Sequence, residues 1–349
     1  MDRERYRYGV CWIAAMGLLL APEFQPGLVG AEPPPAEPVR LIFDTDMGND
    51  IDDALALGVI HALQSRGECQ LLAVTLSKDN EFAGPFCDLV NTFYRRGKIP
   101  VGVVRQGPTP ENSRYIQEPS LAKDDGQLRY PRTLLSGKDA PEATGLLRQV
   151  LSLQPDASVV MVVVGFSTNV SRLLDSPADA HSPLTGRALV AQKCKLLSMM
   201  AGSFAERGRE KEYNVYVDLA AAKNVFANWP TPIVASGFEI GSAITFPATS
   251  IENDFRYVKH HPLSEAYRLY QKMPYDRQTW DLTSVLYAVR PERGYFGVST
   301  TGTIAVDDQQ ITQFTAGKTG RQRYLTVNPE QIVRVREALM QLASQPPGP

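Results

Sequence analysis

Residues 39–54 have the sequence VRLIFDTDMGNDIDDA, an apolar run followed by a loop rich in aspartate. The run Val39–Phe43 predicts a strand, and the helical spacing from Asp53 to Gln64 predicts a helix. Between them, five carboxylates lie within ten positions, at Asp44, Asp46, Asp50, Asp52 and Asp53. Like charges this close repel and raise one another's pKa unless a cation compensates. An acidic loop after a buried strand is typical of α/β proteins, whose ligand sites lie at the strand ends.

Short apolar runs alternate with longer amphipathic stretches along the rest of the chain. The apolar runs predict strands at 71–76, 99–104, 158–164, 196–201 and 232–236. The amphipathic stretches predict helices at 86–95, 143–153, 219–227, 282–289 and 327–343. Strands that alternate with helices imply βαβ units, and the valine-rich run near residue 160 suits a central strand buried on both faces. We therefore expect a single-domain α/β fold with an open, mostly parallel central sheet and helices on both faces.

The N-terminal residues predict a signal peptide and a tether. Three arginines precede an apolar run over residues 9–21, and the small residues at 29–31 suit a signal peptidase. The run is shorter than the roughly 20 residues that span a bilayer, so we expect no stable membrane anchor. We expect export, to the periplasm or outside the cell, after cleavage near Ala31. The expected divisions are a signal peptide over 1–31, a Pro-rich tether over 32–38, the folded domain over 39–344 and a disordered tail over 345–349.

The composition narrows the class of partner. The 349 residues include 36 basic and 38 acidic ones, for a formal charge of −2, and 43% are hydrophobic. This balance gives no electrostatic argument for nucleic acid as a partner. Four cysteines without a C-x-x-C pair exclude a cysteine zinc cluster. The composition leaves open whether the chain forms a homo-oligomer.

The acidic loop favours a metal site over a solvated turn. Carboxylate oxygens are hard ligands that suit Ca²⁺ or Mg²⁺. A turn in which Asp52 caps the helix explains one aspartate and leaves four unexplained. An EF-hand needs glycine and glutamate at loop positions that Asn49 and Leu55 occupy here. A phosphatase with an aspartyl nucleophile explains the first two aspartates but not the adjacent Asp52–Asp53 pair.

The loop resembles the N-terminal signature of the inosine–uridine-preferring nucleoside hydrolase family. That signature is Asp-x-Asp-x-Gly followed by Asp-Asp and a helix, and this chain has two more residues before the acidic pair than the commonest form. Four later motifs follow in the family's order, at 71–80 (LLAVTLSKDN), 162–169 (VVVGFSTN), 212–218 (EYNVYVD) and 279–282 (TWDL). The resemblance extends from about residue 39 to residue 339.

The resemblance implies a calcium-dependent enzyme that hydrolyses the N-glycosidic bond of ribonucleosides to ribose and free base. The family's calcium ligands map onto Asp46, Asp53, Asp281 and the backbone carbonyl of Val164. Asp46 is then also the candidate general base. The family's ribose contacts map onto Asp52, Asn80, Glu212 and Asn214. Asp50 belongs to the longer loop and receives no role from the resemblance.

Trp280 departs from many members of the family, which carry a histidine that protonates the leaving base. An indole is no general acid, but it can stack on a base, and the resemblance then points to the purine-preferring branch. Packing in the core is the alternative for Trp280. Tyr115, in the loop-like segment 106–136, is a candidate for a second wall of the base site, whereas His61 is expected to be a packed or a surface histidine with no part in the site. A non-catalytic, calcium-dependent ribose- or sugar-binding protein on the same fold stays the rival function, although retention of Asp46 favours the enzyme.

Overall fold

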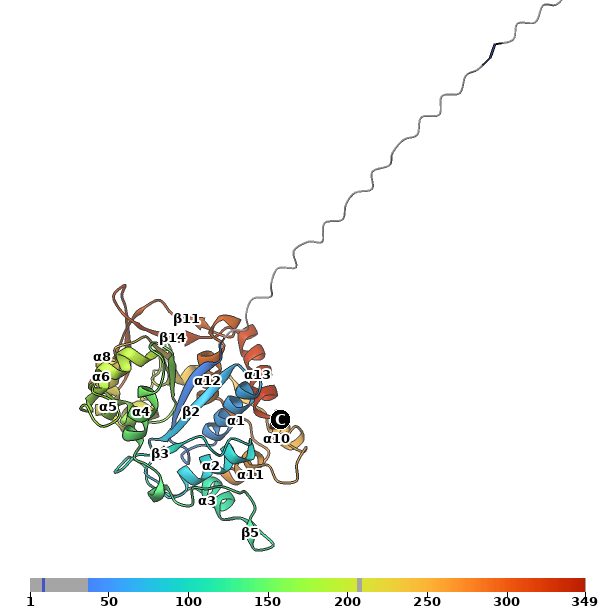
Figure 1. Ribbon diagram of the computed structural model, residues 1–349. Helices are drawn as coiled ribbons and strands as arrows, with labels where there is room; N and C mark the ends of the chain where they lie inside the picture. Colours follow the sequence, from blue (N-terminus) through green and yellow to red (C-terminus); the bar gives the residue numbers. More distant parts are fainter. Residues whose placement is uncertain (1–7, 10–36, 206–208, 349) are drawn as a thin grey trace, which may run out of the picture. The chain divides into compact units, whose positions relative to one another are not determined.

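A mostly parallel sheet runs through the centre of the protein (Figure 1). The computed structural model describes residues 8–9, 37–205 and 209–348, so the predicted signal peptide lies almost wholly outside the described residues. The described residues from 37 onward form one compact unit. Among the described residues, none of the helices combines the length and apolarity that crossing a bilayer requires.

The strand order of the sheet is β13-β12-β14-β8-β7-β6-β1-β2-β3. All strands from β14 to β3 pair in parallel, and β12, β13 and the short β11 add an antiparallel extension at the β14 side. The fold predicted from the sequence is confirmed, and the antiparallel extension is an addition to it. The strand bounds are β1 (Val39–Thr45), β2 (Cys69–Leu76), β3 (Val101–Val103), β6 (Val159–Val163), β7 (Cys194–Met200), β8 (Ile233–Ser236), β11 (Gly297–Val298), β12 (Gly302–Val306), β13 (Thr312–Ala316) and β14 (Gln322–Thr326).

Two hydrophobic clusters cover the two faces of the sheet. Successive side chains of a strand point to opposite faces, so Leu41 and Phe43 of β1 join one cluster while Ile42 joins the other. The first cluster takes helices α1, α2, α12 and α13, and the second takes α4, α5, α6 and α8 (Figure 1). The helix bounds are α1 (Asp52–Ser65), α2 (Ala83–Phe93), α4 (Ala143–Ser152), α5 (Thr168–Asp175), α6 (Gly186–Lys193), α8 (Leu219–Asn228), α12 (Trp280–Val289) and α13 (Pro329–Ala343).

Several short elements connect this framework at the carboxyl ends of the strands. The segment 106–136, which the sequence presents as a loop, contains a helix and a small hairpin. The helix escaped prediction because it is short and has Pro119 inside it. The remaining bounds are α3 (Arg114–Leu121), β4 (Lys123–Asp124), β5 (Gln127–Leu128), α7 (Tyr213–Val217), α9 (Phe238–Ala243), β9 (Thr245–Phe246), α10 (Ala248–Asn253), α11 (Pro262–Tyr270) and β10 (Arg277–Gln278).

Candidate functional site

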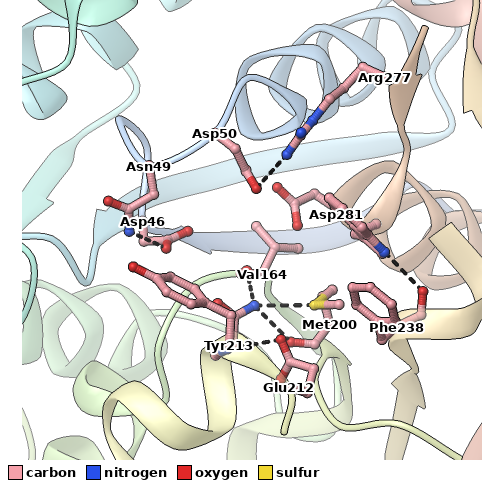
Figure 2. Close-up of a pocket in the computed structure, with 12 residues that line it drawn as sticks. Asp46, Asn49, Asp50, Val164, Met200, Glu212, Tyr213, Phe238, Arg277 and Asp281 are labelled. Atoms are coloured by element: carbon pink, nitrogen blue, oxygen red, sulfur yellow. Dashed lines mark hydrogen bonds and ion pairs between the residues drawn. The ribbon is translucent and has the colours of Figure 1, made fainter. Parts of the chain in front are cut away.

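A cavity of about 220 Å³ is lined by residues that follow the carboxyl ends of β1, β6 and β7, together with the start of α12 (Figure 2). Six of the predicted site residues line it, namely Asp46, Val164, Glu212, Asn214, Trp280 and Asp281. Three predicted residues, Asp52, Asp53 and Asn80, do not line it. The sequence did not assign the other six lining residues to the site, and these are Asn49, Asp50, Met200, Tyr213, Phe238 and Arg277.

The acidic loop begins at the end of β1, and the hydroxyl group of Tyr115 anchors it through hydrogen bonds to its backbone. The Gly48 amide donates to the Tyr115 hydroxyl at 2.6 Å, and that hydroxyl donates in turn to the backbone carbonyl of Asp50. Gly48 has φ of 116°, and a Cβ there would lie 2.6 Å from a methyl carbon of Ile116, so glycine is required at this turn. Tyr115 is completely buried and does not line the cavity. The expectation that it forms a wall of the base site is therefore wrong, because its hydroxyl supports the loop instead.

Asp46 faces the cavity in a fixed orientation. Its Oδ2 accepts a hydrogen bond from Asn49 Nδ2 at 2.6 Å, and Asn49 Oδ1 accepts from Lys78 Nζ at 2.8 Å. Lys78 Nζ also donates to the backbone carbonyl of Thr109, and the side chain is almost completely buried. Burial raises the pKa of Asp46 to about 6, although the bond from Asn49 and the charge of Lys78 act in the opposite direction. Asn49 is part of the longer loop, so the extra residues position the candidate base.

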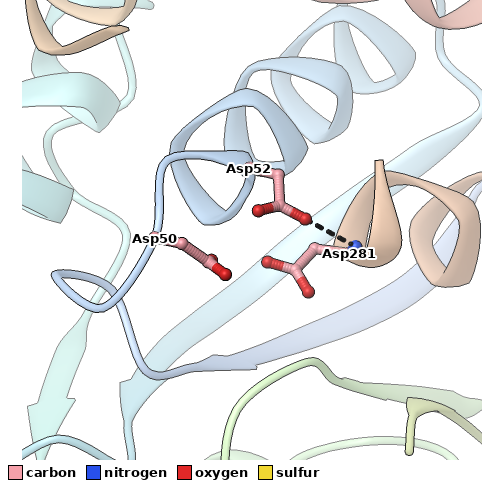
Figure 3. Close-up of side chains that lie close together, drawn as sticks. All are labelled: Asp50, Asp52 and Asp281. Carbon is pink, nitrogen blue, oxygen red and sulfur yellow. Dashed lines mark hydrogen bonds between the residues drawn. The ribbon is translucent and has the colours of Figure 1, made fainter. Parts of the chain in front are cut away.

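Three carboxylates approach one another beside the cavity (Figure 3). One oxygen each from Asp50, Asp52 and Asp281 lies within 4.8 Å of the other two. Asp281 Oδ2 and Asp53 Oδ2 are buried and make no hydrogen bond within the described part of the chain. Burial and the neighbouring carboxylates raise the pKa of Asp53 and Asp281 well above the usual range. These unpartnered oxygen atoms fit a hard divalent cation, which would relieve the repulsion among them.

Val164 follows β6 directly and lines the same cavity as Asp46 and Asp281 (Figure 2). The carbonyl accepts a hydrogen bond from Asn214 Nδ2 at 2.7 Å. A carbonyl oxygen has two lone pairs, so this bond leaves one for a cation. Glu212 caps α7 by accepting from the amides of Asn214 and Val215 at 2.9 and 3.1 Å, and burial raises its pKa to about 7. The Glu-x-Asn pair thus presents both side chains to one wall of the cavity.

Arg277 was not singled out by the sequence, yet its guanidinium pairs with two of the acidic residues. Nη2 donates to Asp50 Oδ2 at 2.6 Å and to Asp52 Oδ1 at 3.2 Å, and Nε donates to Asp52 Oδ1 at 3.3 Å. The guanidinium carbon lies 4.9 Å from the ring centroid of Trp280 and 5.1 Å from that of Tyr270. The structure thereby places Asp50, which the sequence left without a role, in an ion pair at the cavity wall.

Trp280 lines the cavity, but other groups lie against its ring. The Phe238 ring stacks on it at 5.3 Å between centroids with 24° between the planes, and the Arg277 guanidinium also lies over it. The indole N–H donates to the Phe238 carbonyl at 2.9 Å. Phe238 is itself 39% exposed. The aromatic surface available to a ligand therefore belongs to the Phe238–Trp280 pair and not to Trp280 alone.

Asn80 lies outside the cavity, and its side chain is fully used elsewhere. Nδ2 donates to the Pro110 carbonyl at 2.9 Å and to Asn112 Oδ1 at 2.8 Å, and Oδ1 accepts from the amides of Phe82 and Ala83. Asn80 thus ties residues 110–112 to the start of α2, and the expected ribose contact is not supported by this geometry.

Asp52 and Asp53 lie behind the cavity wall with no exposed surface.

The histidines stay away from the cavity. His61 is buried, with Nε2 2.9 Å from Asn91 Oδ1 and its ring stacked on Tyr94, so of the two expected placements it takes the packed one. The described residues include all four histidines of the chain, and none of them lines the cavity.

The comparisons with known proteins agree with this architecture. Among solved structures, the chain is similar to the inosine-uridine preferring nucleoside hydrolase from Bacillus anthracis, with 17% identity, a TM-score of 0.63, and coverage of 88% of this chain and 99% of the other. It is similar to the purine-preferring ribonucleoside hydrolase from Gardnerella vaginalis, with 14% identity, a TM-score of 0.63, and coverage of 87% and 98%. It is also similar to the type III effector protein XopQ complexed with adenosine diphosphate ribose, with 16% identity, a TM-score of 0.65, and coverage of 89% and 96%.

At these identities the structural likeness shows a shared fold. No curated protein sequence matches the chain. The family model of the inosine-uridine preferring nucleoside hydrolases, however, matches residues 41–341, which is most of the 349 residues. The protein therefore belongs to the inosine-uridine preferring nucleoside hydrolase family.

Proposed function

We propose that the protein is a calcium-dependent N-ribohydrolase that releases ribose and free base from ribonucleosides, with a preference for purines. The observation that carries this proposal is the placement of Asp46, Asp281 and the Glu212–Asn214 pair around one cavity. Cleavage of an N-ribosidic bond needs stabilisation of an oxocarbenium-like sugar, an activated water and a tolerable leaving group. The cavity offers a group for each requirement.

The cation would be held by Asp46, Asp53, Asp281 and the Val164 carbonyl, with Asp50 and Asp52 close by. All of these are hard oxygen ligands, and their number and charge suit Ca²⁺. When bound, the cation supplies positive charge that raises the acidity of water at this edge of the sheet.

Asp46 is our candidate for the general base. A general base must present its carboxylate to the water that it deprotonates, and Asp46 faces the cavity next to the proposed cation. Its bond from Asn49 fixes one oxygen, so the carboxylate is oriented before substrate arrives. We assign Glu212 and Asn214 to the ribose hydroxyls, because both line the cavity, and Figure 2 shows Glu212 across the cavity from Asp50. Asp52 would position its neighbours without contacting the substrate. It accepts a hydrogen bond from the Asp281 amide at 3.3 Å and pairs with Arg277.

The charge of the cavity favours a neutral substrate. Four carboxylates line it against one guanidinium, so a divalent cation offsets only part of the negative charge. A phosphate group would meet net repulsion there, whereas a nucleoside would not. The Phe238–Trp280 pair offers an aromatic surface for the base, and stacking of this kind contributes about 1–3 kcal/mol per base. A purine has the larger face, which supports the proposed preference.

Release of reducing sugar from a nucleoside panel, measured after EDTA treatment and again with calcium restored, tests this function. The proposal expects calcium-dependent release, fastest with inosine or guanosine. The rival, a non-catalytic ribose- or sugar-binding protein, expects calcium-dependent ribose binding in calorimetry without release from any nucleoside. We also propose that the chain is exported, which N-terminal sequencing of the mature protein from producing cells would test.

A further inference from the structure

Arg277 brings positive charge to a cavity that otherwise carries carboxylates. Among the described residues that line this cavity, it is the one basic side chain, and no histidine accompanies it. Lys78 lies nearby, but it lines a neighbouring hollow and its ammonium group is bound to Asn49 and Thr109. Hydrolysis, if the proposed function holds, leaves the electron pair of the glycosidic bond on the departing base. That negative charge must be compensated within the cavity.

We propose that Arg277 is a catalytic residue that stabilises the negative charge on the departing base. The reaction then balances as follows. Water adds its hydroxide to C1′ and gives its proton to Asp46, while the C1′–N bond breaks and its electron pair leaves with the base. Arg277 donates hydrogen bonds to the base as this charge develops. The base then takes a proton from solvent water, and Asp46 releases the proton that it accepted to the hydroxide left behind, so one water is consumed overall. Arginine stays protonated in proteins, so it acts by charge and hydrogen bonding and not as a general acid.

The geometry of Arg277 suits this role because some of its guanidinium N–H groups are bound to carboxylates while others have no partner within the described part of the chain. Nε and Nη2 bind Asp50 and Asp52, whereas Nη1 makes no hydrogen bond within the described part of the chain and keeps two N–H groups for a ligand. The rings of Tyr270 and Trp280 lie against the group and restrict its movement. A donor fixed before the reaction needs no reorganisation when charge appears, and this is the condition under which such donors accelerate reactions most.

The position beside Trp280 links Arg277 to the base and not to the ribose. The same cavity presents Glu212 and Asn214 for the sugar, from the start of α7, while Arg277 and the Phe238–Trp280 pair come from β10, α9 and α12. The alternative is that Arg277 only neutralises Asp50 and Asp52. A purely structural counter-ion would affect every substrate alike, and this difference makes the proposal testable.

The test compares three substrates whose leaving groups differ in charge or in basicity. Inosine releases an anionic purine of substantial basicity, p-nitrophenyl riboside releases a weakly basic anion, and 7-methylguanosine is already cationic and releases a neutral base. For Arg277→Gln we expect kcat to fall about a hundredfold or more on inosine, as for loss of one oxyanion donor. The loss should be below about tenfold on p-nitrophenyl riboside and absent or reversed on 7-methylguanosine. Arg277→Lys keeps the charge and should recover part of the inosine rate.

Two further variants separate catalysis from folding. Asp50→Asn with Arg277→Gln removes both charges of the ion pair, so this double variant keeps the net charge and should show the same substrate pattern. Arg293→Gln removes an exposed arginine that pairs with Glu68 at 3.3 Å and should leave all three rates unchanged. Equal losses on the three substrates would overturn the role of Arg277 and leave the proposed function intact. Wild-type protein that hydrolyses none of them with calcium would instead contradict the proposed function itself.

Discussion

Replacement of Asp46 by asparagine should make the calcium-free protein more stable and nearly inactive. Burial raises the pKa of Asp46 from 3.8 to about 6. Each pKa unit corresponds to about 1.4 kcal/mol, so the ionised carboxylate costs the folded state about 3 kcal/mol at pH 8. The amide removes this cost, and its oxygen can still accept the hydrogen bond from Asn49. We expect a gain of about 3 kcal/mol in the free energy of unfolding.

The same substitution removes the candidate base, and loss of a general base costs about 10²–10⁴-fold in rate. Thermal unfolding in EDTA and inosine hydrolysis with calcium measure the two effects in one preparation. Asp125→Asn is the matched control, because Asp125 is exposed on the β4–β5 turn with φ of 53°, a conformation that asparagine tolerates. Activity of Asp46→Asn within about tenfold of wild type, or a lower melting temperature in EDTA, would refute the reasoning.

Three other predictions follow from single features of the site. Tyr115→Phe removes the hydroxyl that supports Gly48 and Asp50, so it should lower the free energy of unfolding by about 1–3 kcal/mol and weaken calcium binding in calorimetry; unchanged affinity would show that the loop needs no such support. In EDTA the protein should melt at a higher temperature at pH 5 than at pH 8. Burial raises the pKa values of Asp44 and Glu212 to about 7, so their stabilising contribution is complete below about pH 4 and is lost as the pH rises through 7. Calcium should shrink this difference, and a melting temperature that rises with pH in EDTA would contradict the prediction. Trp280→Ala should cost inosine hydrolysis about ten- to a hundredfold and uridine less, whereas equal losses with a stability drop of about 3–5 kcal/mol would identify Trp280 as packing only.

The sequence predicted the central framework because each element has a strong local pattern. The valine-rich β6 is buried along its whole length, as its composition indicates. The acidic loop after β1 correctly indicated the edge of the sheet at which the cavity lies. The antiparallel extension was missed because β12, β13 and β14 are each five residues long and mostly exposed or half-buried, so none of them forms a strong apolar run. β12 and β13 pair with each other, and the extension joins the parallel strands through the pairing of β14 with β8.

The site residues likewise divide into those that stand in a recognisable sequence motif and those that only the fold brings to the site. Asp46, Glu212 and Asp281 stand in motifs with fixed spacing, so they could be found, and all three line the cavity. Arg277 has no motif of its own, and only the fold brings it 227 positions back to Asp50. Asn80 shows the opposite case. A polar residue after a strand can contact a ribose, but the side-chain oxygen of Asn80 accepts instead from the amides of Phe82 and Ala83 at the start of α2.

Initial rates of ribose release from inosine, with protein stripped by EDTA and then titrated with calcium, test the central claim most directly. The account predicts no release in EDTA and recovery of turnover as calcium fills the site formed by the acidic loop and Asp281. Asp281→Asn, assayed alongside, should require more calcium for half-maximal rate, because it removes one charged ligand. Turnover that persists in EDTA, or the absence of turnover at any calcium concentration, would contradict the account.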